Sequence, residues 1–286
     1  MRSPRTLLAA QNIRPKKELG QNFLADPSTA TMIVGRSVIS PEDIVLEIGA
    51  GLGALTIPVA RIAQKVYAVE IDPRIIDILK TQLLANHISN VVIVDRNILK
   101  IDIQALVESP RRKIVVMGNL PYNISSQVLV RLIKSRNIIS RAVLMFQKEL
   151  AQRITAHSGC KDYGRLTVMM QYCADTKRIA EVNAALFFPK PKVDSQLLEF
   201  RFKTALKYTA DDETFFFSVI KAAFGNRRKT LKNALATSEL NIDAATAQNV
   251  LERSGINPVR RAETLEVEEF VRLSNNLQQQ IPLIHT

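Results

Sequence analysis

Short runs of β-branched apolar residues alternate with segments of helical periodicity from residue 43 onward. Because parallel strands need a long crossover to return to the same edge of a sheet, this alternation is typical of a parallel sheet covered by helices. The strands are expected at residues 44–48, 66–71, 91–95, 114–118 and 142–146, and the helices between them at residues 54–64, 74–86, 104–109 and 126–135. The sequence therefore predicts an α/β fold with a mostly parallel, Rossmann-like sheet.

The strand and helix signals separate toward the C-terminus. Further strands are expected at residues 165–172, 177–182 and 197–202, and little helix lies between the last two, which predicts an antiparallel hairpin at the end of the sheet. After residue 205 only helical periodicity remains, at residues 211–224, 228–236, 244–253 and 267–277. We therefore expect two domains: residues 1–205, with a basic N-terminal arm, and a small all-helical domain of residues 206–286.

The net charge of +12 is unevenly distributed along the chain. Residues 1–40 carry a net charge of +4, residues 41–110 carry −3, residues 111–203 carry +11, and the remainder is neutral. A basic excess confined to one part of a chain indicates a surface that binds a polyanion, whereas an even spread is typical of a solvated exterior. The distribution therefore predicts a basic, polyanion-binding surface beside an acidic region.

Composition argues against several other classes of protein. A hydrophobic content of 47% is enough for a packed core, and no apolar run approaches the roughly 18–20 residues that span a bilayer. Cys160 and Cys173 are the only cysteines, and they show no zinc-finger spacing with the three histidines, so neither a disulfide nor a metal site is expected. We therefore expect a cytoplasmic protein that needs no metal and does not bind membranes.

A glycine-rich turn follows the first strand of the predicted sheet. Gly49, Gly51 and Ala54 satisfy the loose dinucleotide-binding pattern, and Glu70, at the end of the second strand, occupies the position of a ribose-binding acid. Two hypotheses remain open at this point: an NAD-dependent oxidoreductase and an S-adenosylmethionine (SAM) methyltransferase. Because SAM is cationic and carries no phosphate, the acid Glu47 beside the glycines favours the methyltransferase.

The segment Asn-Leu-Pro-Tyr at residues 119–122 directly follows the fourth strand, at the edge where open α/β sheets bind ligands. An exocyclic adenine amine is a poor nucleophile, because its lone pair is delocalised into the ring. Two acceptors, the Asn119 side-chain oxygen and the Leu120 carbonyl, would hold its hydrogens and aim the lone pair at a methyl donor. Pro121 would stiffen the loop and Tyr122 would stack on the base. The segment therefore predicts methyl transfer to an adenine amine.

These motifs together resemble the rRNA adenine N6,N6-dimethyltransferase family of the bacterial KsgA type. The resemblance covers most of the chain and rests on residues 18–24, the glycine turn, Glu70, and residues 119–122, 147–149, 163–166, 187–195 and 227–231. It implies a class I SAM-dependent methyltransferase domain that dimethylates two adjacent adenines in a hairpin loop at the 3′ end of 16S rRNA, acting as a monomer on the small ribosomal subunit late in assembly.

The resemblance also implies roles for individual residues. The SAM contacts would come from Asn22, Leu24, Gly49, Gly51, Glu70 and Asn119. Phe188 would stack on the target adenine opposite Tyr122, and Arg227, Arg228 and Lys229 in the helical domain would bind rRNA. Where the family usually has an Asp that binds the SAM adenine, this sequence has Asn97, whose amide oxygen can still accept the hydrogen bond. Asp95 is the alternative.

Two further hypotheses belong to relatives of this family. One is an erythromycin-resistance methyltransferase that modifies an adenine of 23S rRNA, and the other is a non-catalytic assembly or transcription factor. Leu120, the chain length and residues 227–231 favour the small-subunit enzyme over the first. The presence of Asn22, Glu70, Asn119 and Tyr122 argues against the second.

Overall fold

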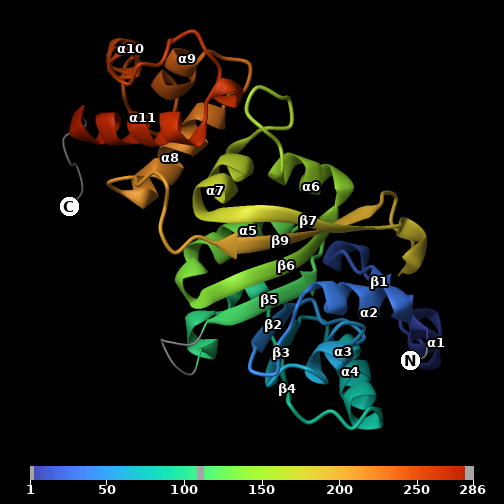
Figure 1. The fold of residues 1–286 in the computed structure, drawn as a ribbon. Coiled ribbons are helices and arrows are strands. Elements are labelled where there is room, and N and C mark those ends of the chain that lie inside the picture. Colours follow the sequence, from blue (N-terminus) through green and yellow to red (C-terminus); the bar gives the residue numbers. More distant parts are fainter. Residues whose placement is uncertain (1–2, 108–112, 281–286) are drawn as a thin grey trace. The chain divides into compact units, whose positions relative to one another are not determined.

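The computed structural model describes residues 3–107 and 113–280, which form two compact units. We call residues 3–151 with 175–202 the sheet unit, and residues 152–174 with 203–280 the helical unit (Figure 1). The predicted domain boundary at residue 205 lies close to the end of the last strand at Phe202. Residues 152–174, which the sequence analysis assigned to the first domain, pack in the helical unit.

The sheet unit is built on a mostly parallel sheet of seven strands within the described residues, in the order β4-β3-β2-β5-β6-β9-β7 (Figure 1). Strands β2 to β6 pair in parallel, and β9 pairs antiparallel with β6. Strands β3 and β4 follow β2 along the chain and lie on one flank of it in the sheet, whereas β5 lies on the other flank. A topological switch point therefore lies between β2 and β5. The strands are β2 Ile44–Ile48, β3 Lys65–Glu70, β4 Val91–Asp95, β5 Ile114–Asn119, β6 Ile139–Gln147, β7 Ala174–Val182 and β9 Ser195–Phe202.

Helices bury apolar residues against one face of this sheet. Ile33 of α2 and Val59 of α3 belong to the same buried cluster as Val45 of β2. Leu79 of α4 packs with Ala68 of β3. The helices of this unit are α2 Pro27–Arg36, α3 Thr56–Ala60, α4 Pro73–Ala85, α5 Ser125–Lys134 and α6 Lys148–Ile154, the last of which continues into the helical unit, with 3-10 turns at Ile98–Lys100, Gln104–Leu106, Arg136–Ile138 and Ala184–Leu186.

A second, two-stranded sheet joins the N-terminal segment to a distant part of the chain. Strand β1 (Phe23–Leu24) pairs antiparallel with β8 (Phe187–Phe188), with Phe23 opposite Phe188. Before β1 lie helix α1 (Pro4–Ala10) and a 3-10 turn at Lys17–Leu19, and Leu7 and Leu8 of α1 pack in one cluster with Phe23. The N-terminal arm is therefore a folded part of the sheet unit.

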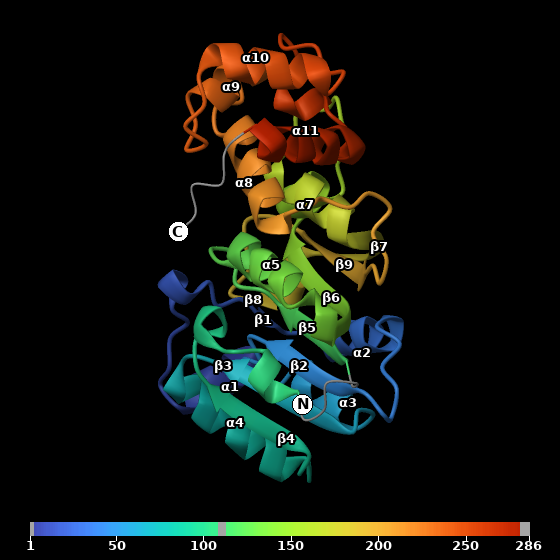
Figure 2. The same cartoon turned by 90° about the vertical axis from the view of Figure 1, so that its left-hand side faces the viewer.

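The helical unit consists of α7 Arg165–Cys173, α8 Glu213–Phe224, α9 Leu231–Ala236, α10 Ala244–Arg253 and α11 Val267–Gln280, with a 3-10 turn at Ala262–Thr264 (Figure 2). Aromatic rings hold its core together. The ring centroids of Tyr172 and Phe216 lie 4.5 Å apart, and Phe224 stacks on Phe270 at 5.7 Å. Within the described residues no helix is long and apolar enough to cross a membrane.

The strand predicted at residues 165–172 is wrong, because this segment forms helix α7. Its near-continuous apolar run fits a buried strand and a buried helix equally well. The local signal for a helix is the Thr167 hydroxyl, which accepts a hydrogen bond from the Gly164 N–H at 3.2 Å, one turn before it. The helices predicted at residues 54–64 and 228–236 are shorter, at Thr56–Ala60 and Leu231–Ala236, and the one at residues 104–109 is a 3-10 turn at Gln104–Leu106 followed by residues partly outside the described ranges.

The backbones of β2 and β5 approach each other unusually closely at their C-terminal ends. A Cβ atom added to Gly118 would lie 2.4 Å from the carbonyl oxygen of Ile48, a separation that no side chain adopts. Gly118 is followed directly by Asn119, and Ile48 by Gly49. The missing side chain at Gly118 therefore sets how near the two strand ends come at the switch point.

We predict that Gly118→Ala destabilises the protein by about 1–3 kcal/mol, because the added methyl group forces the two strands apart. Urea unfolding of the variant and the wild type measures this difference. Gly35→Ala is the matched control: it lies in helix α2 with nothing within 4 Å of the added Cβ, so it should be neutral or stabilise by up to about 1 kcal/mol. Equal stability of Gly118→Ala and the wild type would contradict the prediction.

Candidate functional site

A pocket of about 310 Å³ lies at the switch point, where the C-terminal ends of β2, β3, β4 and β5 meet. Four strand ends and the N-terminal segment supply its walls. The lining residues include Gly49, Gly51, Glu70, Asn97, Asn119, Leu120, Pro121 and Tyr122 from the strand ends, and Asn22 and Leu24 from the N-terminal segment. The structure thus brings together in one pocket all the residues predicted to bind the cofactor, together with residues 119–122.

The glycine turn after β2 lets the backbone form part of the pocket wall. Gly49 and Gly51 have φ angles of 76° and 54°, in the left-handed region that favours glycine. A Cβ atom at Gly51 would meet the Phe23 ring at 3.2 Å. The turn therefore packs directly against β1 and leaves its backbone exposed to the pocket.

The Glu70 carboxylate is held by three backbone N–H groups. Its Oε2 accepts from Gly51 at 2.9 Å, and its Oε1 accepts from Ile71 at 2.9 Å and Asp72 at 3.1 Å. A carboxylate has about four acceptor positions, so roughly one remains, on Oε2. The carboxylate is therefore preorganised, and the remaining position on Oε2 suits one ribose hydroxyl rather than both.

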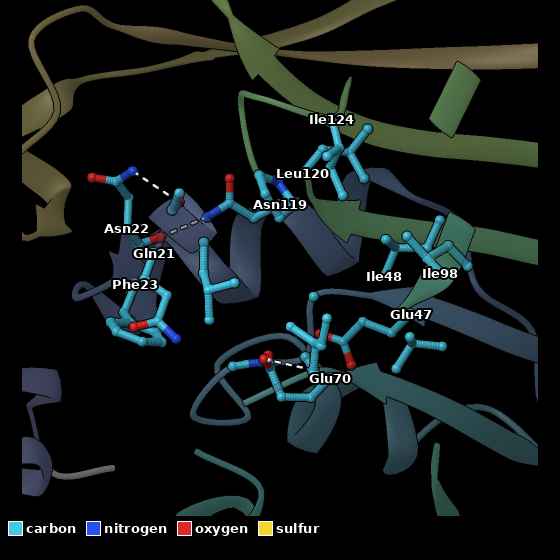
Figure 3. A pocket seen from close by; sticks show the side chains of 18 of the residues that line it. Gln21, Asn22, Phe23, Glu47, Ile48, Glu70, Ile98, Asn119, Leu120 and Ile124 are labelled. Carbon is cyan, nitrogen blue, oxygen red and sulfur yellow. Dashed lines mark hydrogen bonds between the residues drawn. The ribbon is translucent and has the colours of Figure 1, made fainter. Parts of the chain in front are cut away.

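Glu47 lies beside Glu70 in the wall of the pocket and has very different surroundings (Figure 3). Its side chain is 2% exposed, and its Oε2 has no hydrogen-bond partner among the described residues. The hydroxyl of the buried Thr56 interacts with the carboxyl group and lowers its pKa, but by less than burial raises it. Burial, and to a smaller extent the charge of Glu70, raise the pKa of Glu47 to about 8. Glu47 is therefore a neutral acid at neutral pH.

The Asn119 side chain is oriented by the N-terminal segment. Its Nδ2 donates to the backbone carbonyl of Asn22 at 2.9 Å, as Figure 3 shows. The amide oxygen therefore points away from that carbonyl, and no described residue donates to it or to the Leu120 carbonyl. Residues 119 and 120 thus present two unoccupied acceptors at the pocket.

The segment of residues 16–22, which we call the strap, is fixed over the pocket by further amide side chains. The Gln21 Oε1 accepts from the Lys16 N–H at 2.7 Å, and its Nε2 donates to Asp72 at 3.0 Å. Asp72 is buried, and its hydrogen bonds with Arg74 lower its pKa to about 2, so it stays a charged acceptor. The Asn123 side chain donates to the Glu18 carbonyl at 3.0 Å. Neither Gln21 nor Asn123 was among the residues with a predicted role.

Tyr122 contacts the segment of residues 187–195, which also carries Phe188. The Tyr122 hydroxyl lies 3.1 Å from the Ser195 hydroxyl, at the start of β9. Burial raises the Tyr122 pKa, so the phenol stays neutral. Phe188 does not line the pocket itself, but it pairs with Phe23, which does. Ser195 is a positioning residue that the sequence analysis quoted in a motif without a role.

Asn97, rather than Asp95, lines the pocket, while Asp95 is an exposed residue at the end of β4. The Asn97 Oδ1 accepts from the Leu99 N–H at 2.9 Å. This hydrogen bond occupies one of its two lone pairs and leaves the Nδ2 as an available donor. The residue predicted here, Asn97, is therefore the one at the pocket, and the alternative Asp95 is not among its lining residues.

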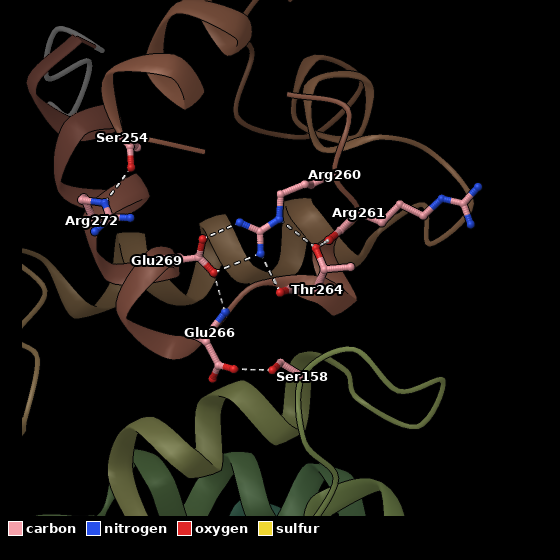
Figure 4. A network of polar contacts seen from close by, with 8 residues as sticks. All are labelled: Ser158, Ser254, Arg260, Arg261, Thr264, Glu266, Glu269 and Arg272. Carbon is pink, nitrogen blue, oxygen red and sulfur yellow. Dashed lines mark hydrogen bonds and ion pairs between the residues drawn. The ribbon is translucent and has the colours of Figure 1, made fainter. Parts of the chain in front are cut away.

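The three predicted RNA-binding residues of the helical unit differ in their surroundings. The Arg227 guanidinium donates to the carbonyls of Lys161 and Tyr163, at 2.5 and 3.2 Å. Arg228 and Lys229 are exposed and have no ion pair with a described residue. A similar division occurs at residues 260 and 261: Arg260 is bound to Glu269, whereas Arg261 extends away from this network (Figure 4).

The switch-point pocket, the glycine turn with its acidic neighbours and the paired acceptors after β5 define the class of Rossmann-like methyltransferases. Comparisons with known proteins agree. The sequence profile described as ribosomal RNA adenine dimethylase matches residues 12–279. The chain belongs to this family, and its methyl donor is therefore SAM and its substrate rRNA.

Relatives with assigned names cover nearly the whole chain. A ribosomal RNA small subunit methyltransferase A from Desulforapulum autotrophicum is 53% identical, over 97% of each chain. One from Clostridium botulinum is 40% identical, over 91% of this chain and 92% of the relative. Among solved structures, a dimethyladenosine transferase from Plasmodium falciparum has a TM-score of 0.74 at 28% identity, over 88% and 95% of the chains. The 23S rRNA methyltransferase ErmE has a TM-score of 0.63 at 26% identity, over 90% and 100%.

We predict that Glu47→Gln changes how stability depends on pH. The pKa of Glu47 rises from 4.5 to about 8 on folding, so its protonated form stabilises the fold fully below about pH 4.5, and that contribution is lost as the pH rises to about 8. Glutamine cannot ionise. The free energy of unfolding of the variant, relative to the wild type, should therefore increase by up to about 1.4 kcal/mol per pH unit between about pH 5 and 8.

Urea unfolding at three pH values across this range measures the effect. Glu18→Gln is the matched control, because Glu18 lines the same pocket but is exposed. A wild type and Glu47→Gln variant with parallel pH dependences would contradict the prediction.

Proposed function

We propose that this chain transfers methyl groups from SAM to the N6 amines of two adjacent adenines in a hairpin loop at the 3′ end of small-subunit rRNA, and that it acts as a monomer on the small ribosomal subunit late in assembly. The names of the relatives that match over almost the whole chain support the small subunit. The observation that carries the chemistry is the fixed orientation of the Asn119 amide beside the Leu120 carbonyl.

The chain's own groups would act on the adenine amine by hydrogen bonding. The Asn119 Oδ1 and the Leu120 carbonyl each accept one N6 hydrogen, which favours a pyramidal nitrogen with its lone pair available. The amide cannot flip without losing its hydrogen bond to the Asn22 carbonyl. Preorganised acceptors of this kind need no reorganisation at the moment of reaction. No general base is required, since a methylated amine nitrogen is acidic enough to release its proton to water.

The pocket fits SAM by its chemistry. SAM, when bound, supplies an electrophilic methyl group on a sulfonium. Glu70 would accept a hydrogen bond from the ribose, Asn97 would bind the adenine ring, and the strap with Asn22 and Leu24 would cover the methionine part. The Oε2 of Glu47 is a buried acceptor in the wall of the pocket, and no hydrogen bond to it comes from residues 3–107 or 113–280.

The target adenine would be held by aromatic rings and its flanking phosphates by lysine side chains. Tyr122 and Phe188 would stack on the unpaired base, at about 1–3 kcal/mol per stacked face. The loop between β8 and β9 carries Lys190 and Lys192, both exposed beside these aromatic residues. In the helical unit, Arg228 and Lys229 would bind phosphates, while Arg227 would hold the loop at Lys161 and Tyr163.

Incubation with labelled SAM and unmethylated small and large ribosomal subunits tests the proposed function directly. Mapping of the modified nucleotides should show dimethyladenosine at two adjacent positions near the 3′ end of the small-subunit rRNA. Label on the large subunit alone would instead indicate an activity like that named for ErmE. No transfer to either subunit, with SAM bound, would indicate a non-catalytic relative.

We predict that Asn119→Ala lowers the single-turnover rate by about 10²–10³ or more, because one of the two acceptors for the amine is lost. The affinity for SAM should change by less than about threefold, since Glu70 and the glycine turn remain. Rapid-quench methylation and calorimetric titration measure the two quantities. An unchanged single-turnover rate would show that the Asn119 side chain has no role in the methyl transfer.

We predict that the double variant Arg228→Ala, Lys229→Ala weakens binding to the small subunit and reduces the dependence of affinity on salt. Each lost phosphate contact should lower the slope of log K against log salt by about 0.7–0.9. Filter binding at several salt concentrations measures the slope. Lys80→Ala is the control, because Lys80 is an exposed lysine of α4 that lies 3.4 Å from Asp77. If the double variant has the same slope as the wild type, Arg228 and Lys229 do not contact phosphates.

A further inference from the structure

Two carboxyl groups share one wall of the cofactor pocket, and backbone N–H groups stabilise a negative charge on only one of them. Glu70 receives three backbone N–H groups, at 2.9, 2.9 and 3.1 Å. Glu47 receives no hydrogen bond at Oε2, and the residue is only 2% exposed. Its neighbours on the adjacent strands, Ala68 and Met117, are apolar. The pocket therefore holds one carboxylate with three backbone donors and one carboxyl group for which a single neutral hydroxyl, that of Thr56, favours the charged form.

We propose that Glu47 is a proton-linked counter-charge for the cofactor: it is a neutral acid in the cofactor-free pocket and becomes a carboxylate, releasing its proton to solvent, when the cationic SAM molecule binds. This inference rests on the proposed function, because it takes SAM as the ligand. It assigns to Glu47 a role distinct from the hydrogen bonding of Glu70.

The physical reason is that a buried carboxylate is stable only when a cation or several hydrogen bonds compensate it. SAM carries both a sulfonium and an ammonium group, and its arrival in the pocket brings positive charge into a region of low dielectric constant, where attraction between charges is strong. In the cofactor-free protein the carboxylate of Glu70 opposes a second negative charge. The observed burial is consistent with this, since it raises the pKa of Glu47 to about 8.

The other charged or titratable groups around Glu47 do not supply a positive charge that would stabilise its carboxylate. Glu70 faces it from β3 with the same sign of charge. Thr56, at the start of α3, supplies one neutral hydroxyl, which lowers the pKa of Glu47 by less than burial raises it. Among the other described residues that line the pocket, the groups of this kind are Glu18, Arg96 and Tyr122, and neither Glu18 nor Arg96 forms an ion pair with Glu47.

The test is calorimetric titration of the full chain with SAM at about pH 6.5, in buffers with different ionisation enthalpies. The dependence of the observed enthalpy on the buffer gives the number of protons exchanged. We expect the wild type to release close to one proton per SAM, because Glu47 is protonated before binding. Glu47→Gln should release close to none. The matched control Glu18→Gln, an exposed acid of the same pocket, should release as many protons as the wild type.

A second measurement needs no variant and remains decisive if Glu47→Gln does not fold. The dissociation constant of the wild type for SAM should fall by up to tenfold per pH unit between about pH 5.5 and 7, since one proton must leave. A dissociation constant that is independent of pH, or equal proton release by the wild type and Glu47→Gln, would overturn the role of Glu47. In both cases SAM still binds, so the proposed function stands, whereas absence of SAM binding would overturn the proposed function itself.

Discussion

The close approach of β2 and β5 at Ile48 and Gly118 determines where the chemical groups of the pocket lie. These strands border the switch point, so the glycine turn that follows β2 and the Asn-Leu-Pro-Tyr segment that follows β5 both begin at this contact. The carbonyl of Asn119 and a Cβ atom added to Gly49 would be separated by only 3.4 Å. Backbone geometry thereby places the glycine turn and the Asn-Leu-Pro-Tyr segment in one small pocket.

The strap couples this pocket to the N-terminal segment. The side-chain amide of Asn119 could face a ligand with either its oxygen or its NH2 group. Because the NH2 group donates to the Asn22 carbonyl, the oxygen faces the pocket. That carbonyl is in place because Gln21 of the strap donates to Asp72, and because the Asn123 side chain donates to the strap carbonyl of Glu18. The amide oxygen that we propose as an acceptor for the substrate amine is therefore oriented by hydrogen bonds formed by a segment about a hundred residues away in sequence. A methyltransferase sheet without such a segment would leave the amide free to rotate.

Most of the sheet and the pocket could be predicted from the sequence, because strand periodicity, glycine turns and strand-end polar residues are local signals. The parallel strands and the positions of Glu70 and Asn119 follow from such signals. Helix α7 could not be predicted in this way, since its apolar residues are buried on more than one side and show neither period clearly. The role of the Arg227 side chain was equally inaccessible, because its partners are backbone carbonyls of a segment 64–66 residues away.

The formal charge of a segment overstates the number of cations that are available to bind RNA. By sequence, residues 1–151 with 175–202 carry a net charge of +9 and residues 152–174 with 203–286 only +3, so charge alone would place the RNA surface on the sheet unit. Yet the guanidinium of Arg141 is paired with Asp43, and those of Arg131 and Arg136 donate to backbone carbonyls. Exposed cations without such partners, among them Lys190 and Lys192, are the groups that can release counterions from a phosphate backbone. Affinity for rRNA should therefore depend on a few short loops of both units rather than on their net charge.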